Sequence, residues 1–304
     1  MKVLILGGNG FIGSYLTKLL SSSHEVVVFS RSVNWEGIKI NNVKYIYGDF
    51  SNLSLVKKSL IGIDIVYHLI SSSNPSSANE NPIRDIEENL ICSIRFLELL
   101  RDVSIKKLVY VSSGGTVYGE ATSQPIKESA ALKPKGAYAI TKVAIEQSIQ
   151  RYSRELGFEY CIIRPSNPYG PGQRYDKNQG VISSFLYRAV TNSQIEIWGD
   201  GNEIRDYIYV EDLTIVLSRV IGIDGSTILN VGSGLGVSTL EILSIVREVT
   251  GLKVSFKHVP KLGHNIEKVT LDNTLAKSML NWEPSKGLMD GIYNQYIWIK
   301  NKLT

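Results

Sequence analysis

The feature that most constrains the fold is a series of short apolar runs separated by segments of helical periodicity. The first run, Val3-Leu4-Ile5-Leu6, leads directly into a glycine cluster, and similar runs follow at residues 26–29, 43–47, 63–69 and 108–111. A run that is apolar at nearly every position is typical of a strand buried on both faces of a parallel sheet. Before the last run, helical spacing places one apolar face at Ile83, Ile86, Leu90, Ile94, Leu97 and Leu100.

This alternation predicts right-handed crossovers and a Rossmann-type α/β fold, in which helices cover both sides of a doubly wound parallel sheet. Beyond Pro165 the pattern changes to turn-rich segments and isolated elements. The elements expected there are a helix near 183–190, strands at 196–198 and 207–210, and a helix at 239–250.

We therefore expect two domains. Residues 1–165 form the main domain, and residues 206–235 return to it. Residues 166–205 and 236–304 form a smaller α+β cap, which would bind the substrate.

Composition argues against several classes of protein. The net charge is only +4 and no five Lys or Arg residues are consecutive, so charge gives no support to a nucleic-acid or membrane-surface partner. Cys92 and Cys161 lack the spacing of a zinc site or a disulfide framework. No apolar stretch approaches the length of a membrane span, and the apolar start is too short for a signal peptide. We expect a cytoplasmic protein without a metal.

The glycine cluster indicates a phosphate-binding loop. Gly7, Gly10 and Gly13 follow the first strand, and a helix opens among them with Phe11 and Ile12. Glycine allows close backbone approach, and the helix start offers free amide groups and a positive dipole end. The spacing is not the more common GxGxxG, and a tight turn alone would also explain it. The position favours a dinucleotide cradle formed by these five residues.

The end of the second strand bears on which dinucleotide binds. An acidic residue there usually hydrogen-bonds the ribose 2′-OH of NAD. This chain has Ser30 and Arg31 instead, which could accept the 2′-phosphate of NADP. Alternatively, Arg31 stacks on the adenine or faces solvent. NAD and NADP both stay open on these residues.

Tyr138 and Lys142 form a candidate catalytic pair. Residues four apart share one helix face, and a nearby ammonium should lower the tyrosine pKa, which makes it a usable general base and acid. Tyr296 and Lys300 have the same spacing, where simple packing is the preferred interpretation. Tyr138 differs because it follows the strand at 108–111, and open parallel sheets bind ligands at the carboxyl ends of their strands. Ser112 and Ser113 at that strand end can add hydroxyl donors.

With these motifs in hand, the chain resembles the extended short-chain dehydrogenase/reductase family over nearly its whole length. Within it, the chain is most similar to nucleotide-sugar epimerases of the UDP-glucose 4-epimerase type. The matching motifs are residues 7–13, Gly48-Asp49-Phe50, His68-Leu69, residues 112–119 (SSGGTVYG), Tyr138 with Lys142, residues 167–172 (NPYGPG) and residues 205–210 (RDYIYV).

The resemblance implies roles for further residues. The cofactor, NAD in this family, would also contact Asp49, Phe50, Leu69, Ile70, Asn89, Ser112 and Pro165, with Tyr138 and Lys142 at its nicotinamide ribose. A nucleotide sugar would contact Ser113, Asn167, Trp198, Arg205 and Val269, and Arg205 would bind its diphosphate. An ion pair with Asp206 is the alternative for Arg205, and a loop cap before Pro168 is the alternative for Asn167.

The resemblance also implies a mechanism. Tyr138 would take the proton of the sugar 4-OH while a hydride leaves C4, and the hydride would return to the opposite face of the 4-keto sugar. Such a cycle consumes no external reductant. Gly115 and Thr116 stand where the family's dehydratases carry an Asp-Glu pair, which argues against dehydration.

Other positions depart from the family pattern. Gly114 stands where such epimerases often carry Ser or Thr for the 4-oxygen, so Ser112, Ser113, Thr116 or a water would supply the hydroxyl. Val269 stands in place of a bulky residue, which suggests room for an N-acetyl group at sugar C2. The second diphosphate arginine of the family is not obvious, and Lys261 or Lys268 could substitute for it.

Two rival functions stay open. A nucleotide-sugar 4-reductase has the same fold and Tyr/Lys pair but consumes NADPH, which Ser30 and Arg31 would suit. A non-catalytic dinucleotide sensor would keep the glycine loop but commonly lacks the pair. By resemblance we also expect a homodimer, formed through the helices at 82–100 and 137–156.

Overall fold

A computed structural model describes residues 1–33, 39–175, 180–260 and 266–303. At its centre is a seven-stranded sheet of order β10-β6-β5-β4-β1-β2-β3, in which every neighbouring pair is parallel. Its strands are β1 (Lys2–Leu6), β2 (Glu25–Ser30), β3 (Val43–Tyr47), β4 (Ile65–His68), β5 (Lys107–Val111), β6 (Glu159–Pro165) and β10 (Thr227–Val231). The doubly wound parallel sheet predicted from the apolar runs is confirmed.

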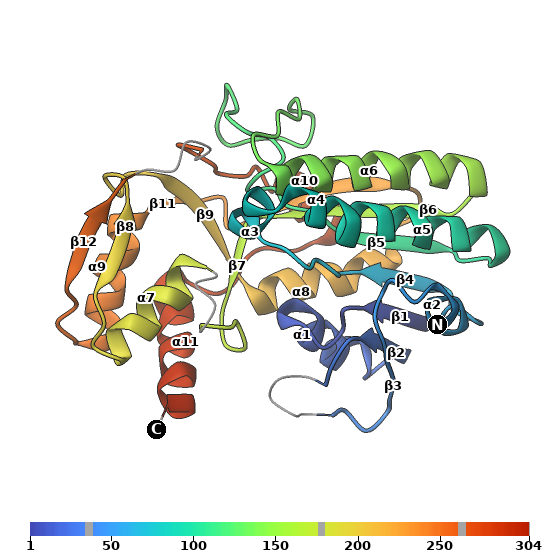
Figure 1. Ribbon diagram of the computed structural model, residues 1–304, viewed down its shortest axis with the longest axis horizontal. Helices are drawn as coiled ribbons and strands as arrows, with labels where there is room; N and C mark the ends of the chain where they lie inside the picture. The colour runs from blue at the N-terminus through green and yellow to red at the C-terminus, as the bar shows by residue number, and fades with distance from the viewer. Residues whose placement is uncertain (34–38, 176–179, 261–265, 304) are drawn as a thin grey trace.

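The central strand β1 shows why its sequence is apolar throughout. Val3 and Ile5 belong to the core formed with α1 (Phe11–Leu20) and α8 (Val210–Arg219). Leu4 and Leu6 belong to the core on the other face, which α2 (Leu53–Ser59), α5 (Cys92–Leu99) and α6 (Ala137–Leu156) complete. Figure 1 shows α5 and α6 on one side of the sheet and α1 and α8 on the other. Each such buried side chain contributes about 1.5–3 kcal/mol, so one strand holds both helical layers.

In the described residues the cap contains two small sheets and three helices, seen at the left of Figure 1. β7 (Asn167–Tyr169) pairs with β9 (Ile204–Tyr209), which pairs with β11 (Gly236–Ser238), and β8 (Ile195–Trp198) pairs with β12 (Phe256–Val259). The helices α7 (Val181–Val190), α9 (Thr239–Thr250) and α11 (Leu288–Leu303) share an apolar core with these strands. The strand expected to reach Val210 ends at Tyr209, because Val210 begins α8.

The chain passes repeatedly between the sheet and the cap. It leaves the sheet after β6, returns with α8, and leaves again after β10. It returns once more with α10 (Thr274–Leu280), whose Ala276 and Leu280 join Trp282 in the core beneath the sheet, and α11 then lies in the cap. The sequence places residues 274–282 in the cap and residues 206–209 of β9 in the main domain, and we propose to exchange the assignment of these two segments.

The segment expected as one helix over residues 82–100 is interrupted. It consists of α4 (Pro82–Asp85), the π-helical turn η1 (Ile86–Ile91), α5 and the 3₁₀ turn η2 (Leu100–Asp102). The prediction of one continuous apolar face is wrong at its start, since Ile83 is 70% exposed and Ile86 42% exposed. A π turn inserts one residue and so rotates the preceding turn by about 100° relative to α5.

Two short elements complete the fold, α3 (Pro75–Glu80) before α4 and the 3₁₀ turn η3 (Val220–Gly222) after α8. Among the helices described, none has the length and apolar character needed to cross a membrane. The described residues also contain no group of His, Cys, Asp and Glu side chains suited to a metal ion.

Candidate active site

The glycine loop between β1 and α1 leaves its backbone open to a ligand. Gly7 adopts a φ of +88°, in the left-handed region that glycine tolerates. A Cβ at Gly13 would lie 2.2 Å from the Gly7 carbonyl oxygen, so only glycine fits the first turn of α1 against this loop. Gly10 is the N-cap of α1 and no side chain caps the helix, which leaves its first amide groups available to phosphate oxygens.

A cleft of about 610 Å³ opens beside this loop. It is lined by the expected cofactor residues Gly7, Gly10, Ser30, Arg31, Asp49, Phe50, Leu69 and Ile70. The residue spacing gave no signal for Asn9, Ser32, Ser71, Cys92 and Arg95, which also line it. The volume lies in the usual range for cofactor pockets. The expected cradle is therefore a real cleft at the carboxyl ends of the central strands.

Polar groups that follow β2 and β3 line this cleft. The Ser30 hydroxyl accepts a hydrogen bond from the Asn9 amide at 3.2 Å. The Asp49 carboxylate accepts hydrogen bonds from the hydroxyl and amide of Ser51 at 2.6 and 2.9 Å, and these bonds, with the nearby Arg31, hold the Asp49 pKa below its usual range. The cleft thus offers the anchored Asp49 carboxylate and the Arg31 guanidinium, among other charged groups, to a ligand.

Some residues expected to contact the cofactor do not line this cleft. The Phe11 ring packs edge-on against Tyr15, and Ile12 packs against the core under β1. Pro165 is buried at the end of β6. Asn89 is 6% exposed, and its Oδ1 accepts a hydrogen bond from the Ser72 amide at 2.9 Å. Contact of these residues with a cofactor stays a prediction.

The tyrosine–lysine pair lies in the first turns of α6. The Lys142 side chain is buried, and its Nζ lies 5.5 Å from the centroid of the Tyr138 ring and 5.1 Å from that of Tyr110. The ammonium donates a hydrogen bond to the Val111 carbonyl at 3.1 Å, at the carboxyl end of β5. The helical spacing therefore places both side chains together at the edge of the sheet where ligands bind.

Burial dominates the protonation of both side chains. It raises the pKa of Tyr138 to about 12, although a hydrogen bond with the Ser71 hydroxyl favours the phenolate. It lowers the pKa of Lys142 to about 8, against the negative charges of Glu146 and Asp85. The Tyr138 pKa is therefore raised, opposite in direction to the lowering expected from Lys142, because burial of the phenolate is the largest influence on it.

A second, smaller cavity lies beside Tyr138 and is lined also by Thr116, Asn79 and Ile266. Gly114 cannot carry a side chain into it, because a Cβ there would lie 2.6 Å from Leu271 Cδ1 and 2.7 Å from the Arg164 carbonyl oxygen. The departure at Gly114 is thus a consequence of close packing against β6.

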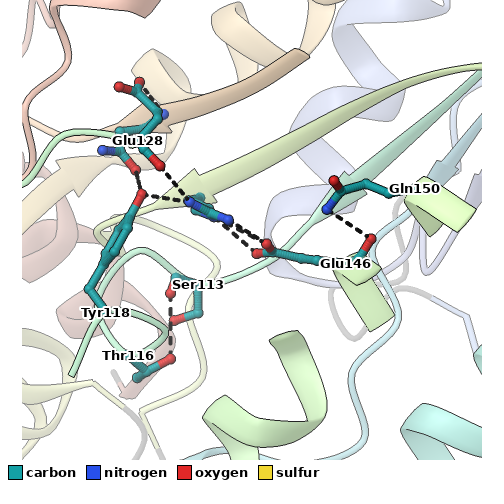
Figure 2. A network of polar contacts seen from close by, with 8 residues as sticks. Ser113, Thr116, Tyr118, Glu128, Glu146 and Gln150 are labelled. Carbon is teal, nitrogen blue, oxygen red and sulfur yellow. Dashed lines mark hydrogen bonds and ion pairs between the residues drawn. The ribbon is translucent and has the colours of Figure 1, made fainter. Parts of the chain in front are cut away.

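The remaining hydroxyl groups of this loop differ in their surroundings. Thr116 donates a long hydrogen bond of 3.5 Å to the Ser113 carbonyl, as Figure 2 shows. The Ser112 hydroxyl is buried and has no partner among the described residues. Of the three candidates for the missing Ser/Thr function, Thr116 is the one that lines a cavity together with Tyr138.

A buried ion pair fixes this loop to α6 (Figure 2). Arg164 of β6 contacts Glu146 of α6 at 2.6 Å, and the two side chains are 3% and 0% exposed. Arg164 also donates to the Tyr118 hydroxyl at 2.9 Å and to the Glu128 carbonyl at 3.3 Å. Removing one partner of a buried ion pair costs about 3–5 kcal/mol. The loop that carries Thr116 and the helix that carries Tyr138 therefore keep one relative position.

Arg205 of β9 is partly buried, and desolvation lowers its pKa. Its guanidinium donates to the carbonyl groups of Ile204 and Glu267, at 2.9 and 3.4 Å. The alternative of an ion pair with Asp206 is wrong, because the Asp206 carboxylate accepts hydrogen bonds from Ser233 and from the amides of residues 234 and 271. Among the described residues no carboxylate forms an ion pair with the Arg205 guanidinium, which is chemically suited to a diphosphate.

The other residues expected at the substrate are more dispersed. The Asn167 amide donates to the Asp206 carbonyl at 2.8 Å and so links β7 to β9. Trp198 is 47% exposed at the end of β8, and Val269 is buried in an apolar cluster with Val117 and Tyr118. Their contact with a substrate stays a prediction. Lys268 is exposed, and Lys261 lies outside the described residues.

A comparison with protein families identifies the class of the protein. Residues 3–232 match the model described as the NAD dependent epimerase/dehydratase family. The chain therefore belongs to this family of NAD-dependent enzymes, and its resemblance to the extended short-chain dehydrogenase/reductases is confirmed.

Individual relatives narrow the class further. The chain is 31% identical over 303 residues, 98% of both chains, to a protein named putative UDP-glucose 4-epimerase from Methanocaldococcus jannaschii. It is 31% identical over 300 residues, 95% of both chains, to dTDP-4-dehydro-6-deoxyglucose reductase of Escherichia coli. The crystal structure of the UDP-glucose 4-epimerase of Thermotoga maritima with UDP-glucose matches the whole of both chains, with a TM-score of 0.94 and 29% identity.

Proposed function

We propose that this protein is an NAD-dependent epimerase that inverts C4 of a UDP-sugar through a transient 4-keto intermediate. One observation carries the proposal: Tyr138, next to the buried Lys142, lines a small cavity together with Thr116 at the edge of the sheet where the cofactor cleft lies. The M. jannaschii and T. maritima relatives support the same activity.

The chain's own residues can manage the proton of such a reaction. Bound NAD would accept a hydride from sugar C4 and return it. Tyr138 Oη would take the proton of the 4-OH and give it back, because it lines the smaller cavity beside Lys142, whereas Lys135, which also lines that cavity, forms an ion pair with Glu120. A charged Lys142 would favour the phenolate, and its lowered pKa of about 8 makes this support sensitive to alkaline pH.

We propose that Thr116 supplies the hydroxyl that Gly114 lacks. It shares the cavity with Tyr138, and its hydrogen bond to the Ser113 carbonyl is long enough to exchange for a sugar oxygen. Arg205 would bind the diphosphate through its partly exposed guanidinium. We also propose that the small side chain of Val269 leaves room for an N-acetyl group at sugar C2.

The direct test is incubation of the purified protein with catalytic amounts of NAD and with UDP-galactose or UDP-GalNAc, without added reductant, followed by NMR. We expect the gluco epimer to form, and comparison of the two sugars shows which C2 group fits. Absence of any 4-epimer from both substrates would overturn the proposal. Turnover of UDP-galactose alone would reject the role assigned to Val269.

A nucleotide-sugar 4-reductase is the second candidate, since the E. coli relative carries that kind of name. Arg31 in the cofactor cleft would suit its NADPH. The two functions differ in stoichiometry, because a reductase oxidises one NADPH for each 4-keto sugar nucleotide consumed. Following absorbance at 340 nm with a 4-keto substrate separates them.

We also propose that the protein is a homodimer through α4, η1 and α6. Ile83, Ile86, Ile91 and Ile140 are 70, 42, 37 and 55% exposed on these elements, an apolar surface that a second copy could cover. Light scattering should give twice the chain mass for the wild type, and Ile86→Glu with Ile140→Glu should give the monomer. A wild-type monomer would contradict the proposal.

A further inference from the structure

Asp85 is a buried carboxylate that the reaction described above leaves without a role. It ends α4, directly before the π-helical turn η1, and is 2% exposed. Within the described residues no Lys or Arg forms an ion pair with it, and it accepts hydrogen bonds from the side chains of Ser73, Asn89 and Thr141. Because burial of a carboxylate is strongly unfavourable, such a fully hydrogen-bonded group needs an explanation.

The three donors come from three elements around the candidate site. Thr141 donates at 2.6 Å and stands between Tyr138 and Lys142 on α6. Asn89 of η1 donates at 2.9 Å. Ser73 belongs to the loop after β4, which also carries Ser71, the hydroxyl bonded to Tyr138. One carboxylate therefore joins the helix of the catalytic pair to the loop that contacts the tyrosine hydroxyl.

Asp85 and Asn89 are hydrogen-bonded to each other across the start of the π-helical turn. The Asn89 amide donates to both Asp85 and Ser73, while its Oδ1 accepts from the Ser72 amide. Both residues stay buried while Ile83 and Ile86 of the same segment are exposed. Such wide turns are rare in proteins and frequently lie at functional sites.

We propose that Asp85 is a positioning residue for the Tyr138–Lys142 pair, which it holds against the loop after β4 through Thr141, Asn89 and Ser73 while its charge acts on both members of the pair. The inference rests on the proposed epimerase function. It assigns Asp85 no contact with the substrate or cofactor.

The electrostatic part of the proposal has a definite sign. Asp85 raises the pKa of Tyr138 and also that of Lys142, since a negative charge disfavours a phenolate and favours an ammonium. The other groups that face Lys142 are Tyr110 and His68 from the sheet and Glu146 from its own helix. Asp85→Asn keeps the size of the side chain and removes the charge, so both pKa values should fall.

The test combines kinetics with the pH profile. Asp85→Asn should lower kcat by about 10-fold or more, with KM changed by less than about 3-fold, because it misplaces the pair without touching the substrate. In the plot of kcat against pH, the acidic limb and the alkaline limb should both move to lower pH, by about 0.5 unit or more. Thr141→Val leaves the charge in place, so it should lower kcat without moving the profile, and Thr141→Ser should restore the rate.

A second readout does not depend on catalysis. The pH dependence of urea unfolding in Asp85→Asn, minus that of Asp85→Asn/Lys142→Met, reports the Lys142 titration. In Asp85→Asn the titration of Lys142 should begin at a lower pH than in the wild type, where the Lys142 pKa is about 8. An unshifted kcat profile together with an unshifted Lys142 titration would overturn the proposal, even if Asp85→Asn were less stable. If the wild type shows no epimerase activity, the proposed function fails while this titration still decides the effect of Asp85.

Discussion

A tyrosine followed four residues later by a lysine occurs in two helices of this protein, α6 and α11. The lysine Nζ lies 5.5 Å from the ring centroid in the Tyr138–Lys142 pair and 6.0 Å in the Tyr296–Lys300 pair, so helix geometry gives nearly the same arrangement twice. The surroundings differ, because Lys142 is buried against the end of β5 whereas Lys300 is exposed. The four-residue spacing alone brings the two side chains together, whereas burial at the edge of the sheet shifts the pKa values of Tyr138 and Lys142.

The largest effect that can break this comparison is loss of the tyrosine hydroxyl. Tyr138→Phe should lower kcat by about 10³-fold, because it removes the group that would carry the C4 proton. Tyr296→Phe is the matched control and should leave kcat unchanged within about 2-fold. Steady-state kinetics with the UDP-sugar that turns over measures both. Similar losses in the two variants would contradict the assignment.

Replacement of the two lysines should have different effects on the stability of the protein. Lys142→Met should raise the free energy of unfolding by about 2–4 kcal/mol at neutral pH, since burial lowers the Lys142 pKa from 10.5 to about 8. Lys300→Met should change it by less than about 0.5 kcal/mol. Urea unfolding measures both differences.

The same experiment has a pH dependence that identifies its cause. Between pH 8 and 10.5 the unfolded chain still binds the Lys142 proton that the folded protein has lost, so wild-type stability rises with pH in this window. The advantage of Lys142→Met should therefore shrink as the pH rises. A constant advantage would point to packing instead of charge burial.

A third variant sharpens what surrounds Tyr138. Thr116→Val removes the hydroxyl that shares its cavity and should lower kcat by about 10²-fold with little change in KM. Thr250→Val is the control, because that hydroxyl donates only within its own helix, to the Val246 carbonyl. An unchanged kcat in Thr116→Val combined with a loss in Ser112→Ala would transfer the role to Ser112.

The smallest expected effect extends the comparison to a buried and an exposed histidine. Burial lowers the His68 pKa from 6.5 to about 3, so below pH 6.5 the unfolded chain binds a proton that the folded protein excludes. Stability should fall by about 1 kcal/mol from this group between pH 6.5 and about pH 5.5. His68→Gln should remove this dependence of stability on pH. His258→Gln, at an exposed position, should leave the dependence in place. Unfolding curves across this range that coincide for wild type and His68→Gln would contradict the prediction.

The parts of the fold that depend on local pattern could be predicted from the sequence. The run Val3-Leu4-Ile5-Leu6 has to be buried on both faces, and the glycines after it have to turn tightly into a helix, so the sheet and the cleft follow. The interruption at η1 could not be predicted, because residues 82–100 are compatible with a regular helix. Hydrogen bonds from distant segments to Asp85 accompany the π turn.

The residues of the site could be predicted where motifs placed them, whereas their pKa values could not. Spacing brought Tyr138 and Lys142 together, but the direction of the Tyr138 pKa depends on burial, which spacing does not report. Arg95 and Cys92 line the cofactor cleft only because of how α5 packs on the sheet. Val269 is buried by contacts with Val117 and Tyr118, residues about 150 positions earlier in the chain.

The repeated passage of the chain between sheet and cap has a mechanical consequence. Separate connections tie the two bodies together, after β6, before α8, after β10, before α10 and before α11. In a cap tethered in this way, rotation about one hinge has to be accommodated by every other connection, so we expect its swing to be restricted. Exchange of a bound sugar nucleotide should therefore proceed by local loop motion, and a single proteolytic cut should not release the cap as a separate fragment.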